Sequence, residues 1–237
     1  MRITLAFILS ISYLVVAQKP LSRMQLDSNA IAQIRQLHDG TLLVRLHSKK
    51  TVIEALIKKG QIKQAMEIEE QQLETNMEIA EAFKSEFNFC PVYFFYSENS
   101  GLVLNKRFDT AFFLNEHLKV DTAIQFKGRN FLCAEIGNRQ SNVAYTREPF
   151  YYVPNDKAAA ERAGYFDDEK KPQKGGVGSY SRNESLLIQD EQFVQLRSPF
   201  PFSQRTRNVI FTIDMLDVVK NMNDKLKQFY NSTKGIR

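Results

Sequence analysis

A short apolar and aromatic run stands near the middle of the chain, Pro91-Val92-Tyr93-Phe94-Phe95-Tyr96. The polar residues 97–101 end it. Side chains on both faces of this run are apolar, which is typical of a strand buried on both sides. We therefore expect a β-strand buried on both faces here, and the rest of the fold is inferred outward from it.

Upstream of this run, residues 41–46 are rich in Leu and Val and follow the turn signal Asp39-Gly40, so they predict a short strand. Residues 48–60 and 61–86 between the two strands have apolar side chains at helical spacing. The order strand, helices, buried strand is typical of a βαβ crossover, whose two strands run parallel.

The longer of these helices carries apolar side chains at steps of three or four residues, a stripe that predicts burial in the core. Glutamates run beside the stripe. They allow an acidic docking face or a cation site, but carboxylates alone at helical steps lack the mixed ligands of a metal site, so a solvated face is favoured. The stripe consists of Ile62, Met66, Leu73, Met77, Ala80, Phe83 and Phe87, and the glutamates are Glu67, Glu70, Glu74, Glu78 and Glu81.

Downstream of the central run, Asp214 can cap a last helix with apolar residues at helical steps. The sequence thus predicts an α/β fold: a single domain with a mixed, mostly buried sheet of about five or six strands, a βαβ crossover at the start, and helices packed on the sheet. The polar stretch 154–183 predicts a long loop, either a functional lid or simply mobile. Further strand candidates are 102–104, 111–114, 131–136 and a hairpin of 186–189 with 193–196.

The N-terminus resembles an export signal. Arg2 is followed by a nearly all-apolar stretch, 3–16, and by Ala17 at a cleavage position. About 14 apolar residues are too few for a membrane span, which needs roughly 20. We expect residues 1–17 to be removed as a signal peptide, leaving a water-soluble domain, 18–237, that is periplasmic or secreted and has no stable membrane span. The alternative is an N-terminal anchor or a buried strand.

The chain has two cysteines, Cys90 and Cys133, both in apolar, strand-like runs. An oxidising compartment permits a disulfide between them, but a free cysteine in such a run also acts as a small hydrophobic residue. Both alternatives stay open. Phe89 and Pro91 predict that Cys90 is buried, which raises the pKa of its thiol and indicates a structural residue rather than a nucleophile.

Composition and motifs exclude several functions. Lys and Arg number 32 and Asp and Glu 27, and the net charge of +5 is spread along the chain, so a nucleic-acid partner is not expected. The chain has no G-x-S-x-G turn, no H-E-x-x-H motif and no phosphate-binding loop. We therefore expect no metal and no cofactor.

One small set of residues is a candidate for ligand binding. Arg45, His47, Ser48 and Lys49 follow the first strand of the crossover, at the sheet edge where α/β folds place ligands. Together with the N-terminus of the next helix they could meet an anion. The alternative, a surface turn, is favoured.

The function that these observations favour is a non-catalytic, exported binding protein whose partner is a protein or a small ligand. The alternative is a hydrolase or transferase with a dispersed active site, in which His47, His117 and the loop 154–183 converge. Asn183 and Asn231 begin N-glycosylation sequons, which matter only in a eukaryotic secretory pathway.

Three segments carry a resemblance: residues 89–97, residues 190–196, and the Pro-Phe-Pro-Phe segment 199–202. In these segments the chain resembles an uncharacterised group of exported α/β proteins of Bacteroidota-type bacteria, a group with no activity or site residues to transfer. The order of elements is also similar to a thioredoxin-like fold. The missing Cys-x-x-Cys argues against the redox role that this second resemblance implies.

Overall fold

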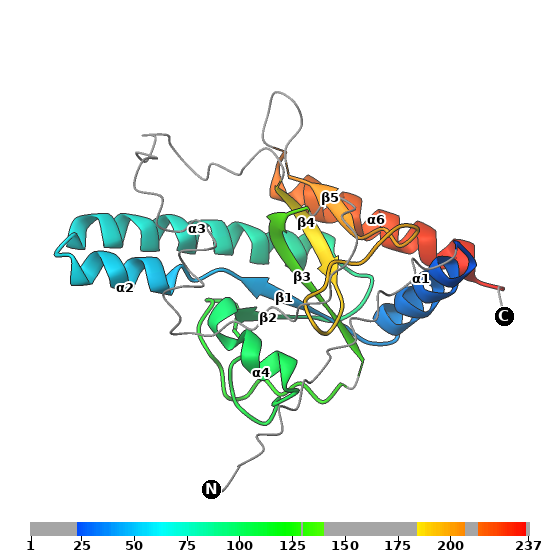
Figure 1. Ribbon diagram of the computed structural model, residues 1–237, viewed down its shortest axis with the longest axis horizontal. Helices are drawn as coiled ribbons and strands as arrows, with labels where there is room; N and C mark the ends of the chain where they lie inside the picture. The colour runs from blue at the N-terminus through cyan, green and yellow to red at the C-terminus, as the bar shows by residue number, and fades with distance from the viewer. Residues whose placement is uncertain (1–22, 129, 140–183, 207–212, 236–237) are drawn as a thin grey trace, which may run out of the picture.

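The computed structural model describes residues 23–128, 130–139, 184–206 and 213–235 (Figure 1). The predicted signal peptide at 1–17 and the polar loop at 154–183 lie outside these ranges. The helices are α1 (Arg23–His38), α2 (Lys50–Lys58), α3 (Ile62–Glu86), a 3₁₀ turn η1 (Ser97–Asn99), α4 (Ser100–Leu104) and α6 (Met215–Thr233); the strands are β1 (Thr41–Leu46), β2 (Val92–Tyr96), β3 (Phe131–Asn138), β4 (Glu184–Gln189) and β5 (Ser203–Arg205).

These strands form one mixed sheet in the order β2-β1-β3-β4-β5. β1 is parallel to both of its neighbours, with Leu42 opposite Val92 of β2 and Leu132 of β3. β4 is antiparallel to β3 and to β5. The parallel pair β1–β2, joined through α2 and α3, confirms the predicted crossover, and α6 confirms the C-terminal helix, which Asp214 caps by accepting the N–H of Leu216.

Each face of the sheet has its own core. On one face, α1, α3 and α6 cover alternate strand residues such as Leu42, Val44 and Leu132 (Figure 1). On the other face an aromatic cluster fills the space under α4 and the loop that follows it, and Phe131 and Cys133 of β3 point into it. Period-two alternation along β3 therefore places successive side chains in different cores.

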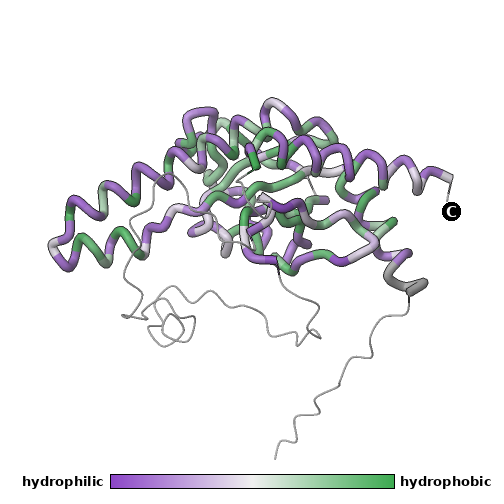
Figure 2. The backbone as a smooth tube through the Cα atoms, turned by 90° about the horizontal axis from the view of Figure 1, so that it is seen from above, coloured by the Kyte–Doolittle hydropathy of each residue, from purple (hydrophilic) through white to green (hydrophobic). Residues whose placement is uncertain are grey.

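The hairpin formed by α2 and α3 projects beyond the edge of the sheet (Figures 1 and 2). None of the residues of α2 is buried, and α3 becomes buried mainly toward its C-terminal end. Two amides fix the hairpin to the sheet. Gln72 Nε2 donates to Asn76 Oδ1 at 3.1 Å, and Asn76 Nδ2 donates to the carbonyl of His47, just after β1, at 2.8 Å.

The predicted core stripe of α3 is wrong for its first half. Ala80, Phe83 and Phe87 are buried as expected, because α6 and β2 lie against that end of the helix. The exposed members are Ile62, Met66, Leu73 and Met77. Helical spacing identifies an apolar face, but nothing in the described part of the chain covers that face over the first half.

Three strand predictions also need correction. Residues 102–104 belong to α4. Residues 111–114 contribute only isolated bridges, Phe113 with Phe95 and Leu114 with Val120. In the predicted hairpin, residues 186–189 lie in β4, while the partner segment is reduced to one bridge between Gln189 and Gln195.

Candidate functional site

The four predicted ligand residues lie at the end of β1 and in the turn that leads into α2. The guanidinium of Arg45 forms an ion pair with the carboxylate of Glu135, which lies opposite it on β3. His47 Nε2 lies 3.3 Å from the carbonyl of Ile136, and Ser48 Oγ accepts the N–H of Lys50 at 3.4 Å. Lys49 has a φ of 50° and precedes α2 without a side-chain cap. The side chains of Arg45, His47 and Ser48 each make a contact within the fold, and a ligand-binding role for the four residues stays a prediction.

Arg45 belongs to a polar row across the aromatic face of the sheet. Its Nε donates to Glu135 Oε2 at 2.7 Å, its Nη2 bonds the same oxygen, and its guanidinium stacks 4.6 Å from the ring centre of Phe193. Gln189 Nε2 donates to Glu135 Oε1 at 2.6 Å. The Oε1 of Gln189 is buried and has no hydrogen-bond partner in the described structure. In this row the cation of Arg45 neutralises the buried carboxylate of Glu135, and the amide of Gln189 adds a hydrogen bond to it.

The histidines of the hydrolase alternative have separate contacts. His117 Nε2 lies 3.5 Å from Glu116 Oε1, and both side chains are exposed. His47 contacts the backbone of β3 instead. Within the described ranges, no three His, Cys, Asp or Glu residues gather so that they could hold a metal ion.

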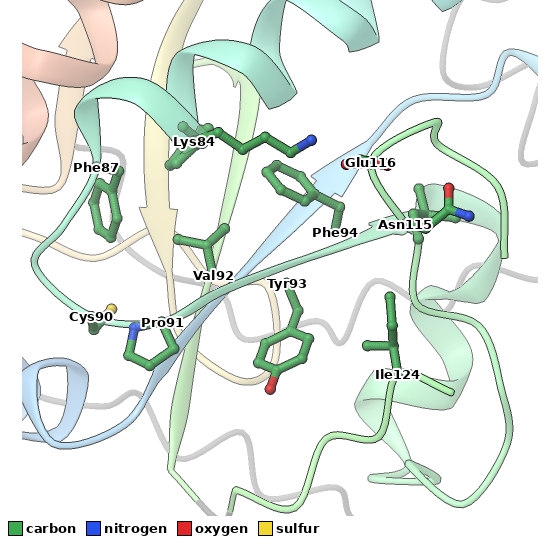
Figure 3. Close-up of a pocket in the computed structure, with 12 residues that line it drawn as sticks. Lys84, Phe87, Cys90, Pro91, Val92, Tyr93, Phe94, Asn115, Glu116 and Ile124 are labelled. Atoms are coloured by element: carbon green, nitrogen blue, oxygen red, sulfur yellow. The ribbon is translucent and has the colours of Figure 1, made fainter. Parts of the chain in front are cut away.

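A groove of about 460 Å³ lies beside β2, the strand at one end of the sheet order (Figure 3). This volume is within the range of ligand-binding clefts. The C-terminal end of α3 forms one wall, and the loop after α4 forms the other. The lining side chains are Phe83, Lys84, Phe87, Cys90, Pro91, Val92, Tyr93, Phe94, Leu114, Asn115, Glu116 and Ile124.

The groove exists because the chain turns away from β2 at Asn115. The N–H of Leu114 donates to the carbonyl of Phe94 at 2.9 Å, so residues 113–114 begin to pair with the outer edge of β2. Asn115 Oδ1 then accepts the N–H groups of His117 and Lys119, at 3.0 and 3.1 Å. An Asn side chain that bonds backbone a few residues on makes a turn. The added strand therefore stops after two residues.

The backbone of Val92 is left unpaired on this outer edge. The N–H of Leu42 donates to the carbonyl of Pro91 at 2.9 Å, and Leu42 lies opposite Val92. In a parallel ladder a residue bonds the two neighbours of the residue opposite it. The N–H and C=O of Val92 therefore point away from β1, and no partner for them is found in the described part of the chain.

Cys90 lines the groove as a free thiol. Burial raises the pKa of this thiol to about 12, although its contact with the backbone of Leu42 opposes the shift. This confirms the expected effect of burial. Cys133 is also free, and burial raises its pKa as well. Cys90 packs against the helix-covered core and Cys133 lies in the aromatic core, so the sheet separates the two thiols and the disulfide left open by the sequence is not formed here.

Comparisons with known proteins add no relative: no family model, no curated protein and no solved structure matches this chain. The resemblance to an exported Bacteroidota-type group and that to a thioredoxin-like fold both stay predictions. In the described part of the chain, no helix is both long enough and apolar enough to cross a bilayer.

Sequence reasoning missed the groove. Its residues come from three segments that contact only in the folded chain, namely the end of α3, β2 and the loop around Asn115. The nearest signal in the sequence was that Pro91 opens the strand, because proline within a sheet is confined to edges and strand starts.

Proposed function

We propose that this protein is an exported, non-catalytic binding protein that holds an extended peptide segment in the groove beside β2. The observation that carries this proposal is the unpaired N–H and C=O of Val92, which face the groove. An extended chain that pairs with a free strand edge gains main-chain hydrogen bonds, while pockets beside the edge select its side chains. The occupant would continue the strand that residues 113–114 begin.

The side chains around the groove define what such a segment should contain. Val92 and Phe94 point toward α3, and Tyr93 points to the other side of the strand (Figure 3). Phe87, Leu114 and Ile124 add apolar surface. Alternate side chains of a bound strand would face the two sides in turn, so a segment with apolar residues at every second position fits. Lys84 and Glu116 provide one charge of each sign at the rim.

Hydrogen exchange tests this pairing directly. Linear peptides selected from a random phage-displayed library on the immobilised protein are the probe. A bound peptide is expected to slow exchange of the Val92 amide by at least about tenfold, and to leave Tyr93, whose amide faces β1, unchanged. Occupancy is also expected to protect Cys90, which lines the groove, from a thiol-alkylating reagent.

The matched variants are V92P and V120S. Proline removes the outward N–H of Val92 without breaking the ladder to β1, so affinity should fall by at least about tenfold. Val120 is exposed outside the groove, and V120S should bind as the parent does. Circular dichroism checks that V92P keeps its sheet. The proposal is contradicted by peptides that bind V92P as tightly as the parent and that leave exchange of the Val92 amide in the parent protein unchanged.

Export is a separate part of the proposal, and the apolar stretch that ends at Ala17 supports it. Protein isolated from its host is expected to begin at Gln18. The mass of its N-terminal peptide measures this, and material that retains Met1 contradicts export by cleavage.

A further inference from the structure

The projecting hairpin, defined as α2 together with residues 61–77, carries most of the large apolar side chains that the described structure leaves exposed. Six of nine such residues lie on it, and the other three are scattered over α4, the loop after it and α6. Exposed apolar residues that occur singly need no explanation, whereas a contiguous group marks a site of interaction. The six are Val52, Ile57, Ile62, Met66, Leu73 and Met77.

On α3 these residues form one stripe. At about 100° per residue, Ile62, Met66, Leu73 and Met77 fall within about 60° of one another around the helix axis. Met66, 64% exposed, is the most exposed large apolar residue of the described chain. Figure 2 shows hydrophobic and hydrophilic residues alternating along both helices of the hairpin. Methionine is flexible and polarizable, which suits a surface that packs against another chain.

A row of carboxylates adjoins this stripe. Glu70, Glu74, Glu78 and Glu81 occupy the next sector of the helix, at about 80–160° on the same scale. All four are exposed, and none forms an ion pair within the described part of the chain, whereas Glu67 in the same sector pairs with Lys63 at 3.9 Å. Like charges at i, i+4 spacing destabilise a helix by about 0.2–0.5 kcal/mol per pair. The isolated protein thus carries two unfavourable features side by side, bare apolar surface and unneutralised negative charge.

We propose that the stripe and the glutamate row together form a docking surface for a basic amphipathic helix of another protein. A helix with apolar residues at i, i+3, i+4 and i+7 covers the stripe, and Lys or Arg on its flank neutralises the glutamates. One partner relieves both unfavourable features. A second copy of this chain would bring two glutamate rows together, and an anionic bilayer would be repelled by the row, so neither occupant fits the charge.

A binding titration with designed peptides tests this surface. The probe is a fluorescent synthetic helix of about five turns, with Leu on one face and Lys on the flanks. The control peptide has Glu in place of every Lys. The full-length protein is expected to bind the Lys peptide at least about tenfold more tightly than the Glu peptide, and the difference should shrink as salt is raised above about 0.15 M.

Variants of the hairpin separate this surface from nonspecific attraction. M66S/L73S should bind the Lys peptide at least about tenfold more weakly than the parent does, because two apolar contacts are removed. E70K/E74K should reverse the preference, so that the Glu peptide binds better. The controls L216S and D224K change an exposed apolar residue and an exposed carboxylate on α6, and both should bind as the parent does. Thermal unfolding checks that all variants are folded.

Three outcomes overturn the proposal. The two peptides bind equally well; M66S/L73S and E70K/E74K bind like the parent; or sedimentation shows a dimer that M66S/L73S dissociates, which would make a second copy the occupant. Liposomes of anionic lipid provide a further arm, and binding to them that the hairpin variants abolish would assign the stripe to a membrane surface. None of these results bears on the groove, whose residues lie outside the stripe.

Discussion

Replacing Arg45 by methionine is expected to lower the free energy of unfolding by about 3–5 kcal/mol, because it leaves the carboxylate of Glu135 buried without its cation. The side chains of Arg45 and Glu135 are only 19% and 11% exposed. The hydrogen bond from Gln189 remains in R45M, but a neutral amide does not neutralise a charge. Urea denaturation followed by circular dichroism measures the change.

A triple variant provides the control for this experiment. R45M/E135L/Q189M replaces the whole polar row by apolar side chains of similar size, and it should lie within about 1 kcal/mol of the parent or above it. Both results are needed. R45M measures how much an unpaired buried charge lowers the free energy of unfolding, and the triple variant measures how much the intact polar row contributes to it. If R45M lowers the free energy of unfolding by less than about 1 kcal/mol, the Arg45–Glu135 pair is not shielded from water as described.

The second large effect is expected at Phe83. This residue is 1% exposed, its ring centre lies 5.4 Å from that of Phe87 and 6.1 Å from that of Phe94, and it is part of the core between α3, α6 and β2. F83A should lower the free energy of unfolding by about 3–5 kcal/mol, because it removes a buried ring and leaves a cavity. Denaturant titration is again the measurement.

The matched control lies on the same helix and in the same predicted stripe. M66A should change stability by less than about 0.5 kcal/mol, because Met66 has little buried surface to lose. If M66A destabilised the protein as much as F83A, the first half of α3 would be packed against part of this chain, and the hairpin surface would not be free for a partner.

The fold could largely be predicted because its main signals are local. The apolar run at residues 91–96, the short strand 41–46 and the helical periodicity between them predict a parallel pair without any knowledge of the rest of the chain. The last helix begins with a capping aspartate, Asp214, which is also a local signal.

The burial of α3 could not be predicted in the same way. Periodicity shows which side of a helix is apolar, but burial depends on whether another element covers that side. Phe83 and Met66 both belong to the predicted apolar stripe, and only Phe83 meets α6 and β2. The sequence favoured a solvated acidic face. That face becomes a candidate for docking only because the apolar stripe beside it is also exposed.

The candidate sites depend on contacts between distant segments, which explains why sequence reasoning missed them. Glu135 is a charged residue inside an otherwise apolar strand, and that signal could have predicted a buried partner. To identify that partner as Arg45, one must know which residue of β1 lies opposite Glu135 of β3. The groove requires the turn at Asn115, which leaves Val92 without a neighbour.

One helix supplies both proposed surfaces. α3 has 25 residues, a length of about 37 Å at 1.5 Å per residue, and it runs without interruption from the outer end of the hairpin to the wall of the groove, where it contributes Phe83 and Lys84. Its tie through Asn76 to the carbonyl of His47 lies between the two ends. A partner docked on the hairpin and a peptide held in the groove would therefore share one continuous helix, anchored at the end of β1 between them.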